Sequence, residues 1–189
     1  MTTETCYIQY YIEYILAIQQ RYGKSESKSK TKTKTKTKLP LCIMTSMDTH
    51  DKTIRLLQRN KYFGMDKAQI TIVQQGQGVP ALNDNSAKLV LNPDDSSKIV
   101  TKPHGHGDIH ELLYKHNVAK TWKQTLGIKW LVLFQDTNGL AFHTLPLMLG
   151  VSTKLNLIMN SLTVPRKAKQ AIGGIAKLVK KETGETRYA

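Results

Sequence analysis

Blocks of apolar residues along the chain predict helices separated by short strands. Residues 3–23 carry apolar side chains at helical spacing, begin with a Thr/Glu start pattern and end at a glycine, which predicts an amphipathic helix. The apolar runs 39–44, 68–73 and 128–134 are short, as expected of strands that are buried on both faces. Of these runs, IKWLVLF (128–134) is the clearest buried strand.

More polar stretches between and beside these runs predict the other elements. Residues 45–60 predict a helix that Asp48 can cap, and residues 108–127 predict one or two further helices. A stretch rich in Asn, Asp and Ser (83–97) predicts a loop, and residues 98–103 predict another strand. Helices and strands thus alternate along most of the chain.

This alternation predicts an α/β fold with a mixed, mainly parallel sheet that is covered on both faces. In such sheets ligands bind beyond the carboxyl ends of the strands. Four predicted strand ends carry polar or Gly-rich sequences, namely MTS (44–46), QQGQG (74–78), PHGHGD (103–108) and QDTNG (135–139). This clustering favours a nucleotide-type pocket over a purely structural domain.

The 189 residues suffice for one domain, and their net charge of +14 is unevenly distributed. Residues 24–38, KSESKSKTKTKTKTK, hold seven lysines and one glutamate and therefore contribute +6. Because this run has no apolar residue to bury, it predicts a disordered, solvated insert between the parts 1–23 and 39–189. The alternative is a basic arm that binds RNA, but the interleaved aromatic residues of a single-strand binder are absent from the run.

Several classes of protein are disfavoured by the sequence. No charge-free apolar stretch reaches about 18 residues, so no membrane span is expected. Nor is there the pattern of a secretory signal. Cys6 and Cys42 lack metal-ligand spacing, which predicts reduced, buried thiols in an intracellular, cytoplasmic protein.

The segment PHGHGD and the helix after it admit two kinds of chemistry. His104, His106 and His110 carry imidazoles that could bind zinc, but the first two precede the predicted helix and the third lies within it. Alternatively, Gly105 allows a ligand to approach the backbone closely, and Asp108 can cap the helix. Amides near that helix start would then face an anion or the edge of a base.

The other strand ends also leave alternatives open. Asp136 could hold Mg²⁺ beside phosphates or serve as a turn residue. The MTS hydroxyls and amides could contact a ligand or begin a helix, and Gln75 could bind a base edge or be exposed to solvent. Arg166 and Lys167 could meet a phosphate or form a solvated basic face. No arrangement for acid/base or nucleophilic catalysis stands out.

Together, six segments resemble one family in order and spacing. They are ETCYIQYYIEYILAIQ, LCIMTSMDTH, YFGM, KPHGHGDIHELLY, KWLVLFQDTNGLAFHTLPLMLGVS and NSLTVPRKAKQAIGGIAKL. These segments are similar to the UDP-sugar pyrophosphorylases, the UTP–monosaccharide-1-phosphate uridylyltransferases. The resemblance implies a partial nucleotidyltransferase catalytic domain of the glycosyltransferase-A-like (Rossmann-like) fold, formed by residues 1–23 and 39–189. It implies an enzyme that converts UTP and a sugar 1-phosphate into a UDP-sugar and pyrophosphate with Mg²⁺.

The resemblance also implies roles for particular residues. Those expected beside the nucleotide are Met44, Thr45, Ser46, Gln75, Gly105 and Asn138. Those expected to meet the reacting phosphates are His106, Arg166 and Lys167. Within the first set, Gln75 and the Gly105 backbone would contact uracil. A further residue, Asp136, would hold the metal. Membranes and nucleic acids are not expected partners.

The sequence departs from the family pattern at its start. The Gly-rich triphosphate loop and first strand of the family do not precede residues 4–19, so we expect a partial catalytic domain. The alternative function is an inactive fragment that binds a nucleotide without turnover. An incomplete sheet would also expose an edge and apolar surface, which predicts poor solubility.

Overall fold

A computed structural model describes residues 4–23, 38–76, 78–165, 167, 169–170 and 177–188. The chain divides into two compact units, residues 1–139 and 140–189, and each is described by itself. Of the predicted Lys/Thr-rich insert 24–38, only Lys38 lies within the described residues. The prediction that the insert is disordered therefore concerns residues outside the described part of the chain.

The first predicted helix is confirmed as α1, Tyr7–Tyr22, and it ends at Gly23. Its buried residues are Tyr11, Ile12 and Ile15, which recur at the spacing of one helix face. The Tyr11 ring meets the Phe134 ring edge to face, with 5.0 Å between ring centroids. Such a geometry is favourable because the positive edge of one ring faces the negative face of the other.

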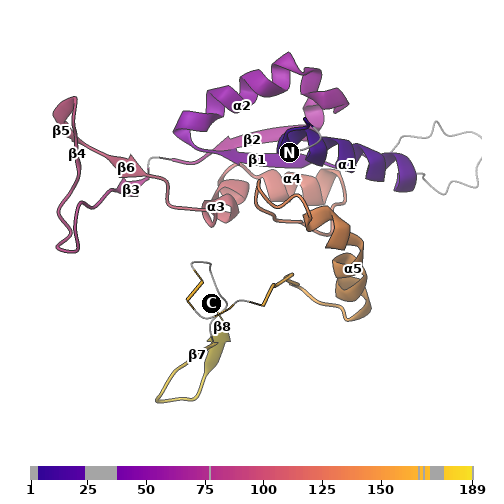
Figure 1. Cartoon of the computed structure of the whole chain (residues 1–189). Helices are drawn as coiled ribbons and strands as arrows, with labels where there is room; N and C mark the ends of the chain where they lie inside the picture. The colour runs from indigo at the N-terminus through magenta and orange to yellow at the C-terminus, as the bar shows by residue number, and fades with distance from the viewer. Residues whose placement is uncertain are drawn as a thin grey trace, which may run out of the picture. The chain divides into compact units, whose positions relative to one another are not determined.

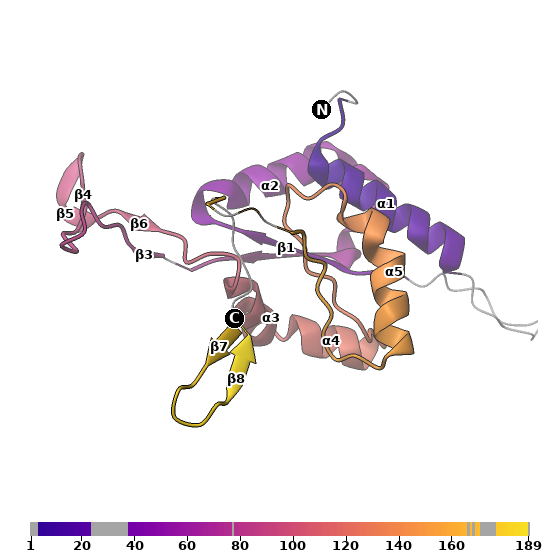
Figure 2. The same ribbon diagram turned by 60° about the horizontal axis from the view of Figure 1, so that its bottom comes forward.

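Two of the predicted strands form a parallel pair. Strand β1, Leu41–Thr45, pairs with β2, Ile70–Gln74, in a register that matches Leu41 with Ile70 and Thr45 with Gln74. Helix α2, Met47–Arg59, and the 3-10 turns η1, Lys61–Gly64, and η2, Lys67–Gln69, connect them. Figures 1 and 2 show α2 on one side of this pair and the helices α3 and α4 on the other.

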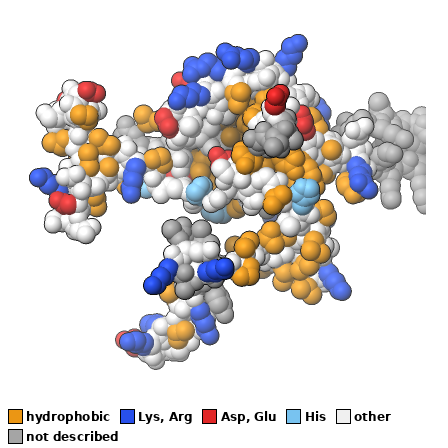
Figure 3. All heavy atoms as spheres, in the orientation of Figure 1, with side chains coloured by type: hydrophobic (Ala, Val, Ile, Leu, Met, Phe, Trp, Pro, Cys, Tyr) orange, Lys and Arg blue, Asp and Glu red, His pale blue; other side chains and the backbone are white. Residues whose placement is uncertain are grey.

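The outer face of α2 is basic, as Figure 3 shows. The exposed residues there include Lys52, Arg55 and Arg59, whereas Leu57 is fully buried. The helix begins at Ser46, its N-cap residue, and not at Asp48 as the sequence predicts. Asp48 lies in the first turn, where a carboxylate interacts favourably with the positive end of the helix dipole.

Residues 108–127 form two helices, α3, Asp108–Lys115, and α4, Val118–Thr125. They are separated at Asn117, which adopts the left-handed conformation that Asn tolerates better than most residues. The buried side chains of these helices form a core cluster with Val73 of β2, with Cys42 and Met44 of β1 at its side. This cluster attaches both helices to the β1–β2 pair.

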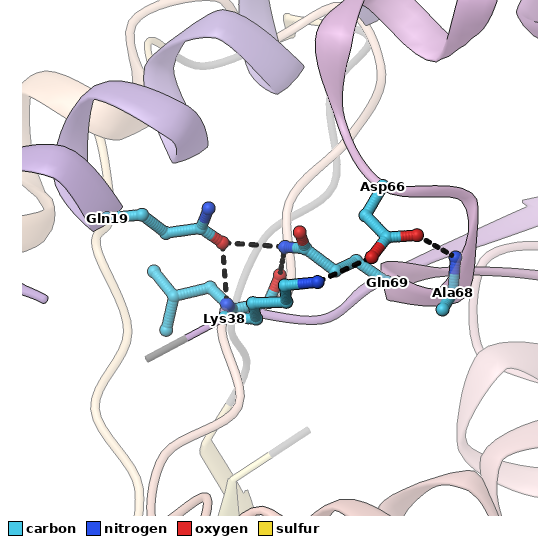
Figure 4. Close-up of polar contacts among 6 residues, drawn as sticks. Gln19, Lys38, Asp66, Ala68 and Gln69 are labelled. Carbon is cyan, nitrogen blue, oxygen red and sulfur yellow. Dashed lines mark hydrogen bonds and ion pairs between the residues drawn. The ribbon is translucent and has the colours of Figure 1, made fainter. Parts of the chain in front are cut away.

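A polar cluster joins α1 to the amino ends of β1 and β2 (Figure 4). The Oε1 atom of Gln19 accepts hydrogen bonds from the Leu39 N–H (2.6 Å) and from Nε2 of the buried Gln69 (2.6 Å). The same Nε2 donates to the Leu39 carbonyl (2.8 Å), and Lys38 Nζ pairs with Asp66 Oδ2 at 2.5 Å. The cluster fixes one edge of the strand pair, and the predicted ligand site lies at the opposite edge.

The predicted loop 83–97 contains part of a two-stranded arm. Strand β3, Val79–Pro80, pairs with β6, Thr101–Lys102, and β4, Leu91–Asn92, pairs with β5, Asp95–Ile99. Both pairs are antiparallel. The loop prediction is wrong for residues 91–92 and 95–97, because the Asn and Asp residues there mark the tight turn of a hairpin, where Asn92 Oδ1 accepts a hydrogen bond from the Asp94 N–H (2.9 Å).

The predicted strand 128–134 is wrong. These residues belong to none of the sheets in the described part of the chain, and Trp130, Leu131, Val132 and Leu133 are 38–52% exposed. An apolar run becomes a strand only when a neighbouring backbone supplies hydrogen-bond partners, and β1 and β2 pair only with each other among the described strands. The exposed apolar surface is the kind that promotes association.

The second unit contains α5, Ala141–Lys154, followed by the antiparallel strands β7, Lys177–Val179, and β8, Thr186–Tyr188. Pro146 lies inside α5, where it removes one helical hydrogen bond. Over the described residues, no helix is long and apolar enough to cross a bilayer. The α/β class is confirmed, and the strands in the described part of the chain form one parallel and three antiparallel pairs.

The two cysteines differ from the prediction that both are buried. Cys6 is exposed before α1, and Cys42 is half-buried in β1; both are free thiols. Burial raises the pKa of the Cys42 thiol to about 11. Cys42 therefore stays protonated at neutral pH and behaves as a small apolar side chain in the strand.

Candidate functional site

The carboxyl ends of β1 and β2 meet at Thr45. The Gln75 N–H donates to the Thr45 carbonyl (2.8 Å), so the strand pairing extends to the first residue after β2. The Thr45 side chain is buried, and its Oγ1 lies 2.8 Å from Nδ1 of His50 and 3.3 Å from the Val73 carbonyl. The Thr45 hydroxyl is thus held by β2 and by the first turns of α2.

Ser46 combines two of the roles that the sequence leaves open. It is the N-cap residue of α2, and its N–H donates to Thr49 Oγ1 (3.1 Å). Its hydroxyl donates to Asp48 Oδ1 (2.5 Å), which holds the pKa of the Asp48 carboxyl below its usual range. Capping therefore explains this serine structurally, and its side chain still lies at the carboxyl edge of the strands.

Gln75 connects the strand edge to the PHGHGD segment. Its side chain is buried, contrary to the alternative that it is solvent-exposed. Its Nε2 donates to the Gly105 carbonyl (2.8 Å) and to Asp108 Oδ2 (3.3 Å). Asp108 Oδ2 also lies 3.3 Å from Nδ1 of His104, so one carboxylate holds a glutamine amide and an imidazole.

The backbone of PHGHGD requires glycine at one position. Gly105 has φ +139°, which side chains with a Cβ rarely adopt, and no atom lies within 4 Å of the position that a Cβ would take. The requirement is therefore conformational and not steric. His106 is exposed in the turn before α3, and Asp108 is the first residue of α3, whose N-cap is Gly107.

The three histidines of this segment do not form a metal site with other side chains. Across the part of the chain that the structure describes, no group of three or more His, Cys, Asp and Glu residues could hold a metal ion. All three histidines are exposed, and His104 alone of the three pairs with Asp108. The segment thus organises a backbone turn beside Gln75.

Asp136 lies on a loop that is attached to α1. The buried Tyr11 hydroxyl donates to the Asp136 backbone carbonyl (2.7 Å), and the Asn138 N–H donates to the Gln135 carbonyl (3.1 Å). Burial, the neighbouring phenol of Tyr7 and the Asp136 carboxylate raise the pKa of Tyr11. The Asp136 residue itself is exposed, so an oxygen donor of the type that Mg²⁺ prefers is available there.

Two of the remaining predicted residues, Met44 and Lys167, make other contacts. Met44 is half-buried against the core cluster under β1, which gives it a packing role. Lys167 belongs to the second unit, where it is exposed and its N–H donates to Gln170 Oε1 (2.8 Å). Arg166 lies outside the described residues.

The structure therefore brings Thr45, Ser46, Gln75 and Gly105 together at one strand edge. It adds two residues to which the sequence assigned no such contact, His50 against Thr45 and Asp108 against Gln75. The sequence hinted at the His50 contact only through its position, because His50 lies in the first turns of a helix that directly follows a strand. Asp108 was expected only as a helix cap.

Comparison with known proteins shows which family the chain resembles. A family model described as UTP–glucose-1-phosphate uridylyltransferase matches residues 15–149. The UDP-sugar pyrophosphorylase of Arabidopsis thaliana is 49% identical over 177 residues, and that of Oryza sativa subsp. japonica is 51% identical over the same length. Each alignment covers 94% of this chain and 28% of the relative, so the chain spans about a quarter of the relatives' length.

A likeness in three dimensions supports the same fold. A crystal structure of a UDP-N-acetylglucosamine pyrophosphorylase from Entamoeba histolytica aligns with a TM-score of 0.64. The alignment covers 80% of this chain and 35% of that chain, at 23% sequence identity. At that identity the likeness supports the nucleotidyltransferase fold alone.

Proposed function

The chain belongs to the UTP–glucose-1-phosphate uridylyltransferase family, and we propose on that premise that it carries the base-binding part of an enzyme of UDP-sugar synthesis. The overall reaction would convert UTP and a sugar 1-phosphate into a UDP-sugar and pyrophosphate. The observation that carries the proposal is the bond from Gln75 Nε2 to the Gly105 carbonyl (2.8 Å) at the carboxyl edge of β1 and β2. It joins the two residues that would face uracil.

The reaction needs little proton chemistry. An oxygen of the sugar phosphate forms a bond to the α-phosphorus of UTP, while the bond from that phosphorus to the bridging oxygen breaks and pyrophosphate leaves. Positioning of the reactants and neutralisation of phosphate charge therefore supply most of the catalysis. This is consistent with a site that is built from amides, backbone groups and hydroxyls.

Particular residues would serve the phosphate side. His106 is exposed in the turn before α3, and Lys167 is exposed in the second unit, so both are available to an anion. Exposure and the family resemblance support His106 and Lys167 as phosphate-binding residues, and the resemblance alone supports Arg166. Asn138 would support the loop that carries Asp136.

Asp136 fits a magnesium ion that is shared with substrate phosphates. Mg²⁺ is typically bound by one or two carboxylates together with phosphate oxygens and water, and Asp136 offers one exposed carboxylate. When bound, the ion would neutralise negative charge on the phosphates. The Tyr11 hydroxyl uses the backbone carbonyl of Asp136, which leaves the carboxylate available.

A second candidate is binding of a uridine nucleotide without turnover. It is supported because the hydrogen bonds on the proposed base side, from Gln75 to Gly105 and to Asp108, all lie within the first unit. The two free thiols favour a reducing compartment, which we propose is the cytoplasm.

One assay separates the two candidates. The purified chain is mixed with UTP, glucose 1-phosphate and Mg²⁺, and release of pyrophosphate is measured beside the thermal midpoint with UTP alone. Release of pyrophosphate supports the uridylyltransferase. A higher midpoint without release contradicts turnover and supports the binding function, and neither effect contradicts both.

A further inference from the structure

The side-chain amide of Gln75 lies against two oxygen acceptors. The Gly105 carbonyl is 2.8 Å and Asp108 Oδ2 is 3.3 Å from its Nε2 atom. A carbonyl and a carboxylate have no proton to donate, so only the NH₂ end of the amide can face them. Rotating the amide by 180° would place Oε1 against both oxygens. The two acceptors therefore determine the orientation of the amide.

The opposite end of the amide is available to a ligand. The two protons on Nε2 match the two acceptors, whereas Oε1 makes no hydrogen bond within the described part of the chain. In the same residues, no fully buried side-chain nitrogen or oxygen lacks a partner, so Oε1 keeps some exposed surface although Gln75 as a whole is buried. Gln75 thus presents a fixed hydrogen-bond acceptor at the carboxyl edge of β2.

We propose that Asp108 is a positioning residue that sets the base specificity of the site through Gln75, an inference that rests on the proposed function. Uracil has an N–H at ring position 3, whereas cytosine has an unprotonated nitrogen there. A fixed Oε1 acceptor can pair with the first and opposes the second. The site therefore selects uridine nucleotides over cytidine nucleotides because Asp108 and Gly105 prevent the amide from turning.

The carboxylate of Asp108 matters because an amide in its place could offer a donor. With Asn at this position, the new side chain could turn its NH₂ group towards Gln75. That group could then donate a hydrogen bond to Oε1 of the rotated Gln75 amide. The Gly105 carbonyl would then oppose that rotation alone. A hydrogen bond to a charged acceptor is also stronger than one to a neutral acceptor, so Asp108 contributes more than its distance of 3.3 Å alone suggests.

The test compares Asp108→Asn with Glu111→Gln in the 189-residue chain. Both changes convert a carboxylate of α3 into its amide, but Glu111 pairs with Lys115 on the surface, where both side chains are more than half exposed. Affinities for UTP and CTP are measured by calorimetry at one Mg²⁺ concentration. We expect wild type and Glu111→Gln to prefer UTP by about tenfold or more, and Asp108→Asn to lose most of that preference. An unchanged ratio in Asp108→Asn would overturn the inference.

A second measurement needs no ligand. The Gln75 NH₂ resonances are identified by their loss in Gln75→Met, and their hydrogen exchange is compared with that of the exposed Gln124. Exchange at Gln75 should be slower than at Gln124 in wild type. It should accelerate in Asp108→Asn but not in the control Glu111→Gln. Equal exchange in wild type and Asp108→Asn would overturn the positioning role. A wild-type chain that binds neither nucleotide would instead contradict the proposed function, while the exchange measurement still decides the role of Asp108.

Discussion

The Thr45 hydroxyl lies 2.8 Å from Nδ1 of His50 and 3.3 Å from the Val73 carbonyl. A hydroxyl has one proton, so both contacts are hydrogen bonds at once only if Thr45 donates to Val73 and the Nδ1–H of His50 donates to Thr45. This arrangement assigns the proton of His50 to Nδ1. It connects α2 to the ends of both strands beside the candidate site.

His50→Ala should therefore destabilise the fold. Removing the imidazole leaves a buried hydroxyl with only its longer hydrogen bond, which costs about 1–2 kcal/mol. Urea unfolding of the variant measures the loss. His110→Ala is the matched control because His110 is also helical but exposed. Equal stability of the two variants would show that the His50 contact contributes nothing.

Tyr11→Phe should lower stability by about 1 kcal/mol. The change removes the hydroxyl that donates to the Asp136 carbonyl (2.7 Å) but keeps the ring that packs on Phe134. Tyr114→Phe, at a site that is 84% exposed, should have no measurable effect. Thermal unfolding compares the two, and a Tyr11→Phe variant as stable as the control would contradict the anchoring of this loop by α1.

Asp136→Asn should abolish the Mg²⁺-dependent part of UTP binding and of any turnover. The carboxylate is lost, but the backbone carbonyl that accepts from Tyr11 remains, so folding should be unaffected. Asp94→Asn removes the same charge from an exposed position of the hairpin and serves as the control. Calorimetric titration of UTP with and without Mg²⁺ measures the effect. A full Mg²⁺ response in Asp136→Asn would place the metal carboxylate elsewhere.

Cys42 should make stability fall at alkaline pH. Its pKa rises from 9.0 to about 11 on folding, because burial disfavours the thiolate. Between these pH values the folded state binds more protons than the unfolded state, so the stability from the neutral thiol is complete below pH 9 and is lost as pH rises towards 11. Urea unfolding at pH 8 and pH 10.5 should show a smaller decline in Cys42→Ala. An identical decline in both proteins would contradict this origin.

The helices and strands that depend on the local spacing of apolar residues were predicted correctly from the sequence. The strands at 39–44 and 68–73 and the helices in 108–127 have apolar spacing and length that depend only on nearby residues. The strand prediction for 128–134 was wrong because strand formation requires a neighbouring backbone that this run's own sequence does not specify. The loop prediction missed the hairpin around Asn92 because turn residues are typical of both loops and tight hairpins.

The site was predictable only in part, for a similar reason. Gln75 and Gly105 were identified because they follow strand ends and match the family pattern. Their bond to each other, and the contact of Asp108 with Gln75, join residues about thirty positions apart and follow only from the fold. The nucleotide roles of Gln75, Gly105 and the other residues at the strand ends, the metal role of Asp136, and the phosphate roles of His106, Arg166 and Lys167 all stay predictions.

Binding of UTP at Gln75 is the most direct test of the account. The thermal midpoint of the 189-residue chain is measured with and without UTP and Mg²⁺ for wild type, Gln75→Leu and Gln58→Leu, which alters an exposed glutamine of α2. We predict that UTP raises the midpoint of wild type and Gln58→Leu but not that of Gln75→Leu. The same rise in all three proteins, or a rise in none, would contradict a uridine site at this strand edge.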